Sequence, residues 1–202
     1  MKRAARVLAA TTLLTVLAAP AQAEKRTAIF AGGAFWSVEA DFDKLPGVLA
    51  TTPGYIGGST ANPTYFDHAA TGHREAVAVL FDDARLPYDE LVSYFFHSID
   101  PADADGQFCD RGHSYTTAIY TVGEDEMAAA QKGKAAAEKE LKQAIVTGIV
   151  AAPQFWPAEE YHQDYYKKNP ARYQRSREAC GRDRRVQEIW GEKAYKPTTR
   201  GR

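Results

Sequence analysis

The clearest pattern along the chain is an alternation of side chains between residues 73 and 82. One face of this stretch holds Glu75, Val77, Val79 and Phe81, and the other holds Ala76, Ala78 and Leu80. Because both faces are apolar apart from Glu75, the pattern predicts a strand in the interior of a β-sheet.

Shorter apolar runs and helical periodicities predict the other elements. Strands are expected at residues 25–31, 48–55, 115–122 and 143–151, and helices at residues 36–45, 88–98, 124–142 and 157–168. Pro53 indicates that the strand at 48–55 is short or lies at a sheet edge. Since strands and helices interleave, the chain is predicted to form an α/β (α+β) fold in which helices cover a mixed sheet.

The first 23 residues have the layout of a secretory signal peptide. A basic leader at 1–6 is followed by an apolar stretch at 7–19 and by small residues at 21–23. The apolar stretch is too short to span a bilayer comfortably. We therefore predict cleavage after Ala23, a periplasmic or secreted protein without a stable membrane anchor, and a single domain at 24–202.

Composition limits the function of the mature chain. Of the 25 Lys and Arg residues, three lie in the leader, which leaves 22 against 26 acidic residues and a net charge of −4. This balance argues against nucleic-acid binding. The two cysteines, Cys109 and Cys180, would face an oxidising compartment, where they either form a disulfide or leave one reactive thiol.

Glu75 is the first candidate for chemistry, because it shares its strand face with three apolar residues. Burial on that face would disfavour the carboxylate, raise the pKa of Glu75 and let the protonated acid donate a hydrogen bond. The alternative is a glutamate at the end of a strand that reaches solvent.

The loop at 107–115 is the second candidate, because it gathers a thiol, a carboxylate, an imidazole and a phenol. Cys109, Asp110 and His113 could hold a metal ion. A zinc site needs three or four ligands, and no second Cys/His pair accompanies this one, so a metal is not favoured.

Aromatic residues gather beside predicted turns, at Phe35, Trp36, Tyr55, Tyr65, Tyr115, Phe155, Trp156 and Tyr161. Such a cluster indicates a pocket for an apolar or soft group, since sulfur packs well against aromatic rings. His68 and His73 are expected at the surface. The basic stretch at 175–185 is expected to be a solvated helix face.

One turn has the form that often presents a reactive group. The apolar run at 27–31 ends in Gly32-Gly33, and a predicted helix begins just after it. Glycines permit a tight turn, and a helix start aims free N–H groups at whatever sits there. Ala34, at the centre of the turn, carries no reactive group.

These stretches resemble, in order, the motifs of the A-type peptide methionine sulfoxide reductases. The family's opening Gly-Cys-Phe-Trp, followed closely by Glu, reads here Gly33-Ala34-Phe35-Trp36-Ser37-Val38-Glu39. Later matches are Leu45-Pro46-Gly47-Val48, Gly54-Tyr55-Ile56-Gly57-Gly58, Asn62-Pro63-Thr64-Tyr65, Gly72-His73-Arg74-Glu75-Ala76-Val77, Asp110 with Tyr115, Ala158-Glu159-Glu160-Tyr161-His162-Gln163-Asp164-Tyr165 and Cys180-Gly181-Arg182. The resemblance implies a two-layer sandwich with a ferredoxin-like core and a long irregular C-terminal region.

The resemblance also implies a reaction. The substrate would be the S-epimer of methionine sulfoxide, free or in oxidised proteins, with its methyl group against Phe35 and Trp36. The sulfoxide oxygen would accept hydrogen bonds from Tyr65, Tyr115 and a protonated Glu75.

In the family a cysteine thiolate attacks the sulfoxide sulfur and becomes a sulfenic acid, which a second cysteine converts to a disulfide. Here Asp110 would shape the pocket and Cys180 is the resolving candidate. A thioredoxin-type donor or another dithiol would reduce the disulfide. The resemblance implies a monomer with no bound cofactor or metal.

The nucleophile position, however, is Ala34, and Ser37 stands where some relatives have a further cysteine. Alanine cannot form the covalent intermediate, and a serine oxygen cannot run the thiol–disulfide cycle. We therefore expect an impaired or inactive reductase. It is either an active enzyme's sequence with its cysteines replaced or a catalytically silent member that still binds the sulfoxide. A third possibility, Cys109 as the nucleophile, has no support in the family pattern.

Overall fold

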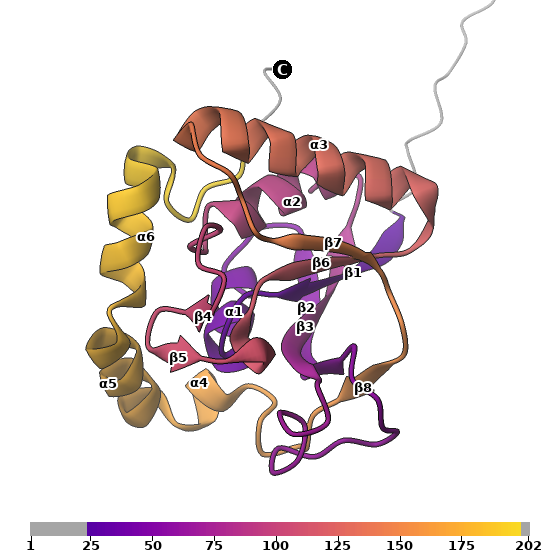
Figure 1. Cartoon of the computed structure of the whole chain (residues 1–202), viewed down its shortest axis with the longest axis vertical. Coiled ribbons are helices and arrows are strands. Elements are labelled where there is room, and N and C mark those ends of the chain that lie inside the picture. The colour runs from indigo at the N-terminus through magenta and orange to yellow at the C-terminus, as the bar shows by residue number, and fades with distance from the viewer. Residues whose placement is uncertain (1–23, 199–202) are drawn as a thin grey trace, which may run out of the picture.

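Six strands form one mixed sheet at the centre of the molecule, which the computed structural model describes over residues 24–198 (Figure 1). They are β1 (Lys25–Ala31), β2 (Val48–Ile56), β3 (Arg74–Asp82), β6 (Ala118–Thr121), β7 (Gly148–Ala151) and β8 (Phe155–Pro157). Their order is β7-β6-β1-β3-β2-β8, and neighbours are antiparallel except for the parallel pair β6 and β7. β3 lies inside the sheet, as its alternation predicts. The predicted signal peptide lies outside the described residues.

The four strands β6-β1-β3-β2 form a ferredoxin-like core. Helix α1 (Phe35–Phe42) connects β1 to β2, and helix α2 (Tyr88–Phe96) follows β3. The chain returns to β6 through a separate hairpin of β4 (Gly106–Gln107) and β5 (Asp110–Arg111) and a 3-10 turn (His113–Tyr115). The predicted α/β (α+β) sandwich is therefore confirmed.

The two faces of the sheet carry side chains of different size. On one face, the ring of Phe30 stacks against Phe42 of α1 and Phe95 of α2, at centroid distances of 5.0 and 4.9 Å. On the other face, a smaller cluster contains Ala31, Ile56, Ala76, Ala118 and Tyr120. The large aromatic side chains therefore place α1 and α2 over the Phe30 face, where they bury most of the core.

The remaining helices extend this arrangement. Helix α3 (Gly123–Leu141) packs on α2 and lies along the top of Figure 1. The C-terminal region contains α4 (Tyr165–Lys168), α5 (Pro170–Cys180) and α6 (Arg182–Trp190), and α5 and α6 run down one side of the molecule (Figure 1). The predicted irregular C-terminal region is thus largely helical after residue 164. Within residues 24–198, no helix combines the length and the apolar character that crossing a membrane requires.

The predicted helix at 157–168 is wrong for most of its length. Residue 157 ends β8, turns follow, and only α4 is helical. The reason is tertiary, since the Glu159 carboxylate accepts hydrogen bonds from the Tyr55 hydroxyl at 2.8 Å and the Tyr65 N–H at 3.0 Å. These bonds hold the segment against the sheet and override its helix propensity.

Three predicted strands differ in extent or position. The strand predicted at 115–122 is β6, which covers only residues 118–121, because Tyr115 belongs to the 3-10 turn. β7 covers only the last four residues of the predicted strand at 143–151. β2 is nine residues long and is a true edge only in its first half, because β8 pairs with its residues 54–56. Pro53 lies just before that paired part, where its missing N–H is tolerated.

Candidate active site

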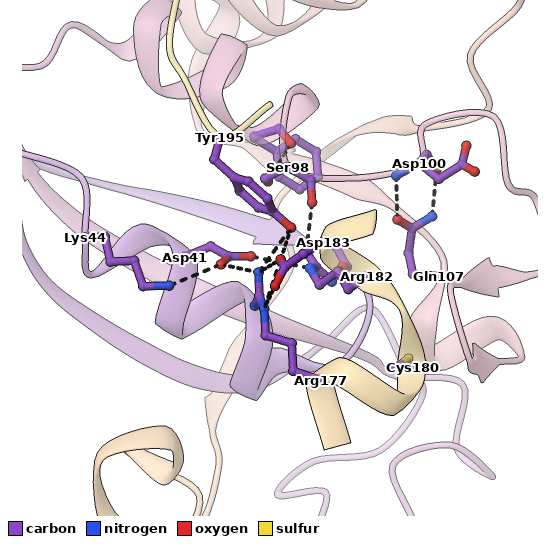
Figure 2. Close-up of polar contacts among 12 residues, drawn as sticks. Asp41, Lys44, Ser98, Asp100, Gln107, Arg177, Cys180, Arg182, Asp183 and Tyr195 are labelled. Carbon is purple, nitrogen blue, oxygen red and sulfur yellow. Dashed lines mark hydrogen bonds and ion pairs between the residues drawn. The ribbon is translucent and has the colours of Figure 1, made fainter. Parts of the chain in front are cut away.

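The turn between β1 and α1 requires glycine. Gly33 has a φ of +91°, and a Cβ built there would lie 2.7 Å from the Cβ of Gln107. Gln107 is itself fixed, because its amide exchanges hydrogen bonds with the backbone of Asp100 at 2.7 and 2.9 Å (Figure 2). The β4–β5 hairpin therefore packs on the turn and sets the position of Ala34.

A small pocket of about 70 Å³ opens beside this turn. It is lined by all eight side chains that the sequence proposes for the site: Ala34, Phe35, Trp36, Tyr65, Glu75, Asp110, Tyr115 and Cys180. Its other lining residues are Ser37, Phe108, Cys109, Tyr173, Ser176, Arg177 and Arg182. Residues from the start of α1 to the start of α6 thus meet at one place.

Stacked rings form one wall of the pocket. Trp36 stacks on Tyr165 at a centroid distance of 3.9 Å, and its indole N–H donates to Nδ1 of His162 at 3.0 Å. Tyr65 lies with its ring centroid 6.4 Å from that of Phe35 and 6.2 Å from that of Trp36. This fixed aromatic surface suits a methyl group or a polarisable sulfur atom.

Glu75 faces the same pocket from β3 and is only 2% exposed, so the solvent-reaching alternative is wrong. Burial raises the pKa of Glu75 to about 8, and the negative charge of Asp110 adds to the increase. The backbone N–H of Phe35 donates to Oε2 at 2.9 Å and lowers the pKa of Glu75, but the effect of burial is larger. Glu75 is therefore protonated at neutral pH and can donate a hydrogen bond.

Two phenols and a second carboxyl complete the polar side of the pocket. Burial raises the pKa of Tyr65 and of Tyr115, and the Glu75 charge adds to both increases. Both hydroxyls therefore remain protonated and can donate. Burial also raises the pKa of Asp110, against the opposing influence of Arg182.

Cys109 and Cys180 form a disulfide at the edge of the pocket, which decides the question that the sequence left open. The proposed metal ligands Cys109, Asp110 and His113 do not come together. Among residues 24–198, the only group of three or more His, Cys, Asp or Glu residues whose ligand atoms lie close together joins Asp110 to the two cysteines. Its sulfurs are bonded to each other, so neither is the thiolate that a metal needs.

We expect this disulfide to stabilise the fold, because it ties the β4–β5 hairpin to the end of α5 across a 71-residue separation. Replacing both cysteines by serine should lower the free energy of unfolding by about 2–4 kcal/mol. Equilibrium unfolding in guanidinium measures this, with Ser176→Ala as the control on the same helix. An unchanged unfolding midpoint would show that the disulfide has no stabilising role.

A buried ion-pair network joins α1 to two arginines of the pocket lining (Figure 2). Asp41 of α1 lies 2.8 Å from Nη2 of Arg177 and 3.3 Å from Nε of Arg182. All three side chains are buried, so the predicted solvated face at 175–185 is wrong for both arginines. Arg182 also donates to the carbonyl oxygen of Gly32 at 3.0 Å, which ties the turn before Ala34 to the start of α6.

From α5, sequence reasoning named Cys180 but missed the other three residues of the pocket lining. Tyr173, Ser176, Arg177 and Cys180 line the pocket, and their three- and four-residue spacing is that of one helix face. This stripe was the available signal. His68 and His73, predicted at the surface, are both buried.

The geometry supports recognition of a small polar group that carries a methyl on one side. Rings would hold the methyl, and protonated donors would hold an oxygen. The start of α1 beside Ala34 would lower the pKa of a thiol placed there. The methyl side chain of Ala34 itself supplies no nucleophile.

Comparison with known proteins agrees with this geometry. Residues 26–194 match the family model described as peptide methionine sulfoxide reductase. "Peptide methionine sulfoxide reductase MsrA 2" of Rhizobium meliloti is 56% identical over 173 residues, which cover 86% of this chain and 87% of that protein.

Two solved structures were also similar. Methionine sulfoxide reductase A of Corynebacterium diphtheriae superposes with a TM-score of 0.69 at 33% identity, over 74% of this chain and 77% of that one. Saccharomyces cerevisiae Mxr1 in complex with Trx2 superposes with a TM-score of 0.51 at 20% identity, over 75% and 90% of the two chains, which supports the fold alone. This chain belongs to the peptide methionine sulfoxide reductase family.

Proposed function

We propose that this chain recognises the S-epimer of methionine sulfoxide, free or in oxidised proteins, and that Ala34 leaves it unable to reduce what it binds. The observation that carries the proposal is the buried carboxyl of Glu75 beside the aromatic wall and Ala34 in one pocket. The family's reaction needs a thiolate at the turn, whereas recognition needs only the wall and the donors.

Each lining group has a role in this recognition. The methyl group of the ligand packs on Phe35 and Trp36, whose rings stack against Tyr65 and Tyr165 respectively. The sulfoxide oxygen accepts hydrogen bonds from Glu75, Tyr65 and Tyr115. Since a thioether has no such oxygen, the buried donors discriminate the sulfoxide from methionine.

The reductant and the location of the protein are part of the same proposal. A nucleophilic thiol at position 34 would be oxidised to a sulfenic acid, and a thioredoxin-type or other dithiol would reduce it. Saccharomyces cerevisiae Mxr1, which shares this fold, has been solved in complex with Trx2. The predicted leader at 1–23 supports action in the periplasm or outside the cell. In this proposal the chain works without a bound cofactor.

The pH dependence of binding tests the role of Glu75. Because its pKa is raised to about 8, the carboxyl donates below that pH and loses its proton above it. Affinity for the S-sulfoxide should therefore fall roughly tenfold between pH 7 and pH 9. Tryptophan fluorescence, with Trp36 in the pocket wall, follows the titration.

Glu75→Gln is the matched variant, because an amide oxygen can still accept from the Phe35 N–H while the amide nitrogen donates to the ligand. It should bind the sulfoxide at pH 7 with an affinity that no longer changes with pH. A parallel fall of affinity in both proteins would remove Glu75 from the proposed role.

A further inference from the structure

A buried histidine with no role in the proposed recognition lies against Glu75. His68 is 4% exposed, and its Nε2 is 3.6 Å from Oε1 of Glu75. Nε2 has no hydrogen-bond partner in the described part of the chain. Burying a ring nitrogen without a hydrogen bond costs folding free energy. The position of this nitrogen beside the Glu75 carboxyl therefore requires an explanation.

The other ring nitrogen fixes the proton positions. Nδ1 of His68 lies 2.9 Å from the backbone carbonyl oxygen of Tyr65. Because a carbonyl oxygen only accepts, Nδ1 carries the proton, and Nε2 of the neutral ring is a bare lone pair. The ring is held between Tyr55 and Tyr65, at centroid distances of 4.9 and 5.7 Å. His68 therefore presents an acceptor to Glu75 in a fixed orientation.

The two oxygens of Glu75 are not equivalent. Oε2 accepts the backbone N–H of Phe35 at 2.9 Å, which suits the carbonyl-like oxygen of a protonated acid. The acid proton is therefore favoured on Oε1, the oxygen that faces His68. A single proton can lie on Oε1 beside a neutral ring, or on Nε2 beside a carboxylate.

We propose that His68 is a positioning residue that shares one proton with Glu75 and so keeps a proton available for the sulfoxide oxygen. The proposal rests on the proposed function of the pocket. When the shared proton lies on Oε1, Glu75 donates it in a hydrogen bond to the bound oxygen and the His68 ring is neutral. When the proton lies on Nε2, transfer of that same proton to Oε1 restores the donor and leaves the ring neutral again.

Other charged and titrating groups surround the pair on every packed element. The loop before β3 contributes Tyr65, Asp67 and His73, and β2 contributes Tyr55. The hairpin and the 3-10 turn contribute Asp110 and Tyr115, and the segment after β8 contributes His162. The shared proton can occupy two positions, so the pair loses it at a higher pH than Glu75 would alone.

His68→Asn tests the pair. An asparagine amide can still donate to the Tyr65 carbonyl, but it places nothing at the Nε2 position. The alkaline midpoint of S-sulfoxide binding should move down by at least about 0.5 pH unit, while affinity at pH 6 stays within about threefold. His68→Gln, which fills more of the ring's volume without titrating, should move the midpoint in the same direction.

His97→Asn is the matched control. His97 is equally buried, with Nδ1 2.6 Å from the Lys196 carbonyl oxygen and Nε2 3.8 Å from Glu140. His97 thus repeats the contacts of His68, a carbonyl at Nδ1 and a glutamate near Nε2, but it does not line the pocket. Replacing His97 should therefore leave the pH midpoint of binding unchanged.

An unchanged midpoint in both His68 variants, with folding intact, would overturn the proposal. If His68→Asn does not fold, the Glu75 carboxyl is titrated directly by carbon NMR in His68→Gln and in the unaltered chain, and equal midpoints overturn the proposal. This measurement needs no ligand. Failure of the unaltered chain to bind the sulfoxide would therefore reject the proposed function separately from the His68–Glu75 pair.

Discussion

Ala34→Cys should convert this chain into an active methionine sulfoxide reductase. The new thiol would lie at the start of α1, where the helix N-terminus lowers its pKa, and in the pocket that Glu75 lines. Its thiolate attacks the sulfoxide sulfur, Glu75 supplies the proton, methionine leaves and a sulfenic acid remains at position 34. With a dithiol reductant, methionine formation should rise by on the order of 10³- to 10⁶-fold over the unaltered chain.

Ala34→Ser is the control for this experiment. Serine places an oxygen at the same point, but an oxygen cannot be cycled by dithiols, so turnover should stay at the background. Methionine is quantified by chromatography, and thermal unfolding confirms that both variants are folded. A well-folded Ala34→Cys protein that produces no methionine would show that the chain lacks more of the catalytic machinery than the nucleophilic thiol at position 34.

Asp41→Asn should cause a large loss of stability. The carboxylate of Asp41 is the buried countercharge of Arg177 and Arg182. Arg182 also donates to the backbone carbonyls of Gly32 and Ser98 and lies over the Phe108 ring, none of which carries a negative charge. Removing it leaves buried positive charge uncompensated, which costs about 3–5 kcal/mol. Urea-induced equilibrium unfolding measures the change.

The matched control is Asp183→Asn. Asp183 also pairs with Arg177, but its side chain is 57% exposed, so its removal should cost at most about 1 kcal/mol. Equal losses from the two variants would contradict the distinction between the buried and the exposed carboxylate. Because Arg182 holds the Gly32 carbonyl, Asp41→Asn should also weaken sulfoxide binding.

Elements with strong local signals were predictable from the sequence. β3 alternates along its whole length, and α3 is rich in helix formers with acidic residues in its first turn. The segment at 157–168 misled the prediction because Glu159 bonds to groups on β2 and in the loop before β3. Interactions across about a hundred residues leave no periodic signature.

The members of the pocket were predictable in part from local patterns, but their common role only from motif order. Glu75 was named from its strand face and Phe35 and Tyr115 from the aromatic cluster, the resemblance joined them in one site, and the structure brings them together. The burial of His68 was not predictable, since a histidine in a polar loop has no neighbouring pattern that reports its surroundings. Arg182 was likewise hidden in a basic stretch, where its partner Asp41 lies far away in the sequence.

Calorimetric titration of the unaltered chain with the S- and R-epimers of methionine sulfoxide and with methionine tests the central claim most directly. We expect saturable binding of the S-epimer at pH 7 and its recovery unreduced. Methionine should bind at least about tenfold more weakly, because it leaves the buried donors without an acceptor. Equal affinity for methionine and the S-sulfoxide, or no binding of either, would contradict a pocket that recognises the sulfoxide and lacks only the nucleophile.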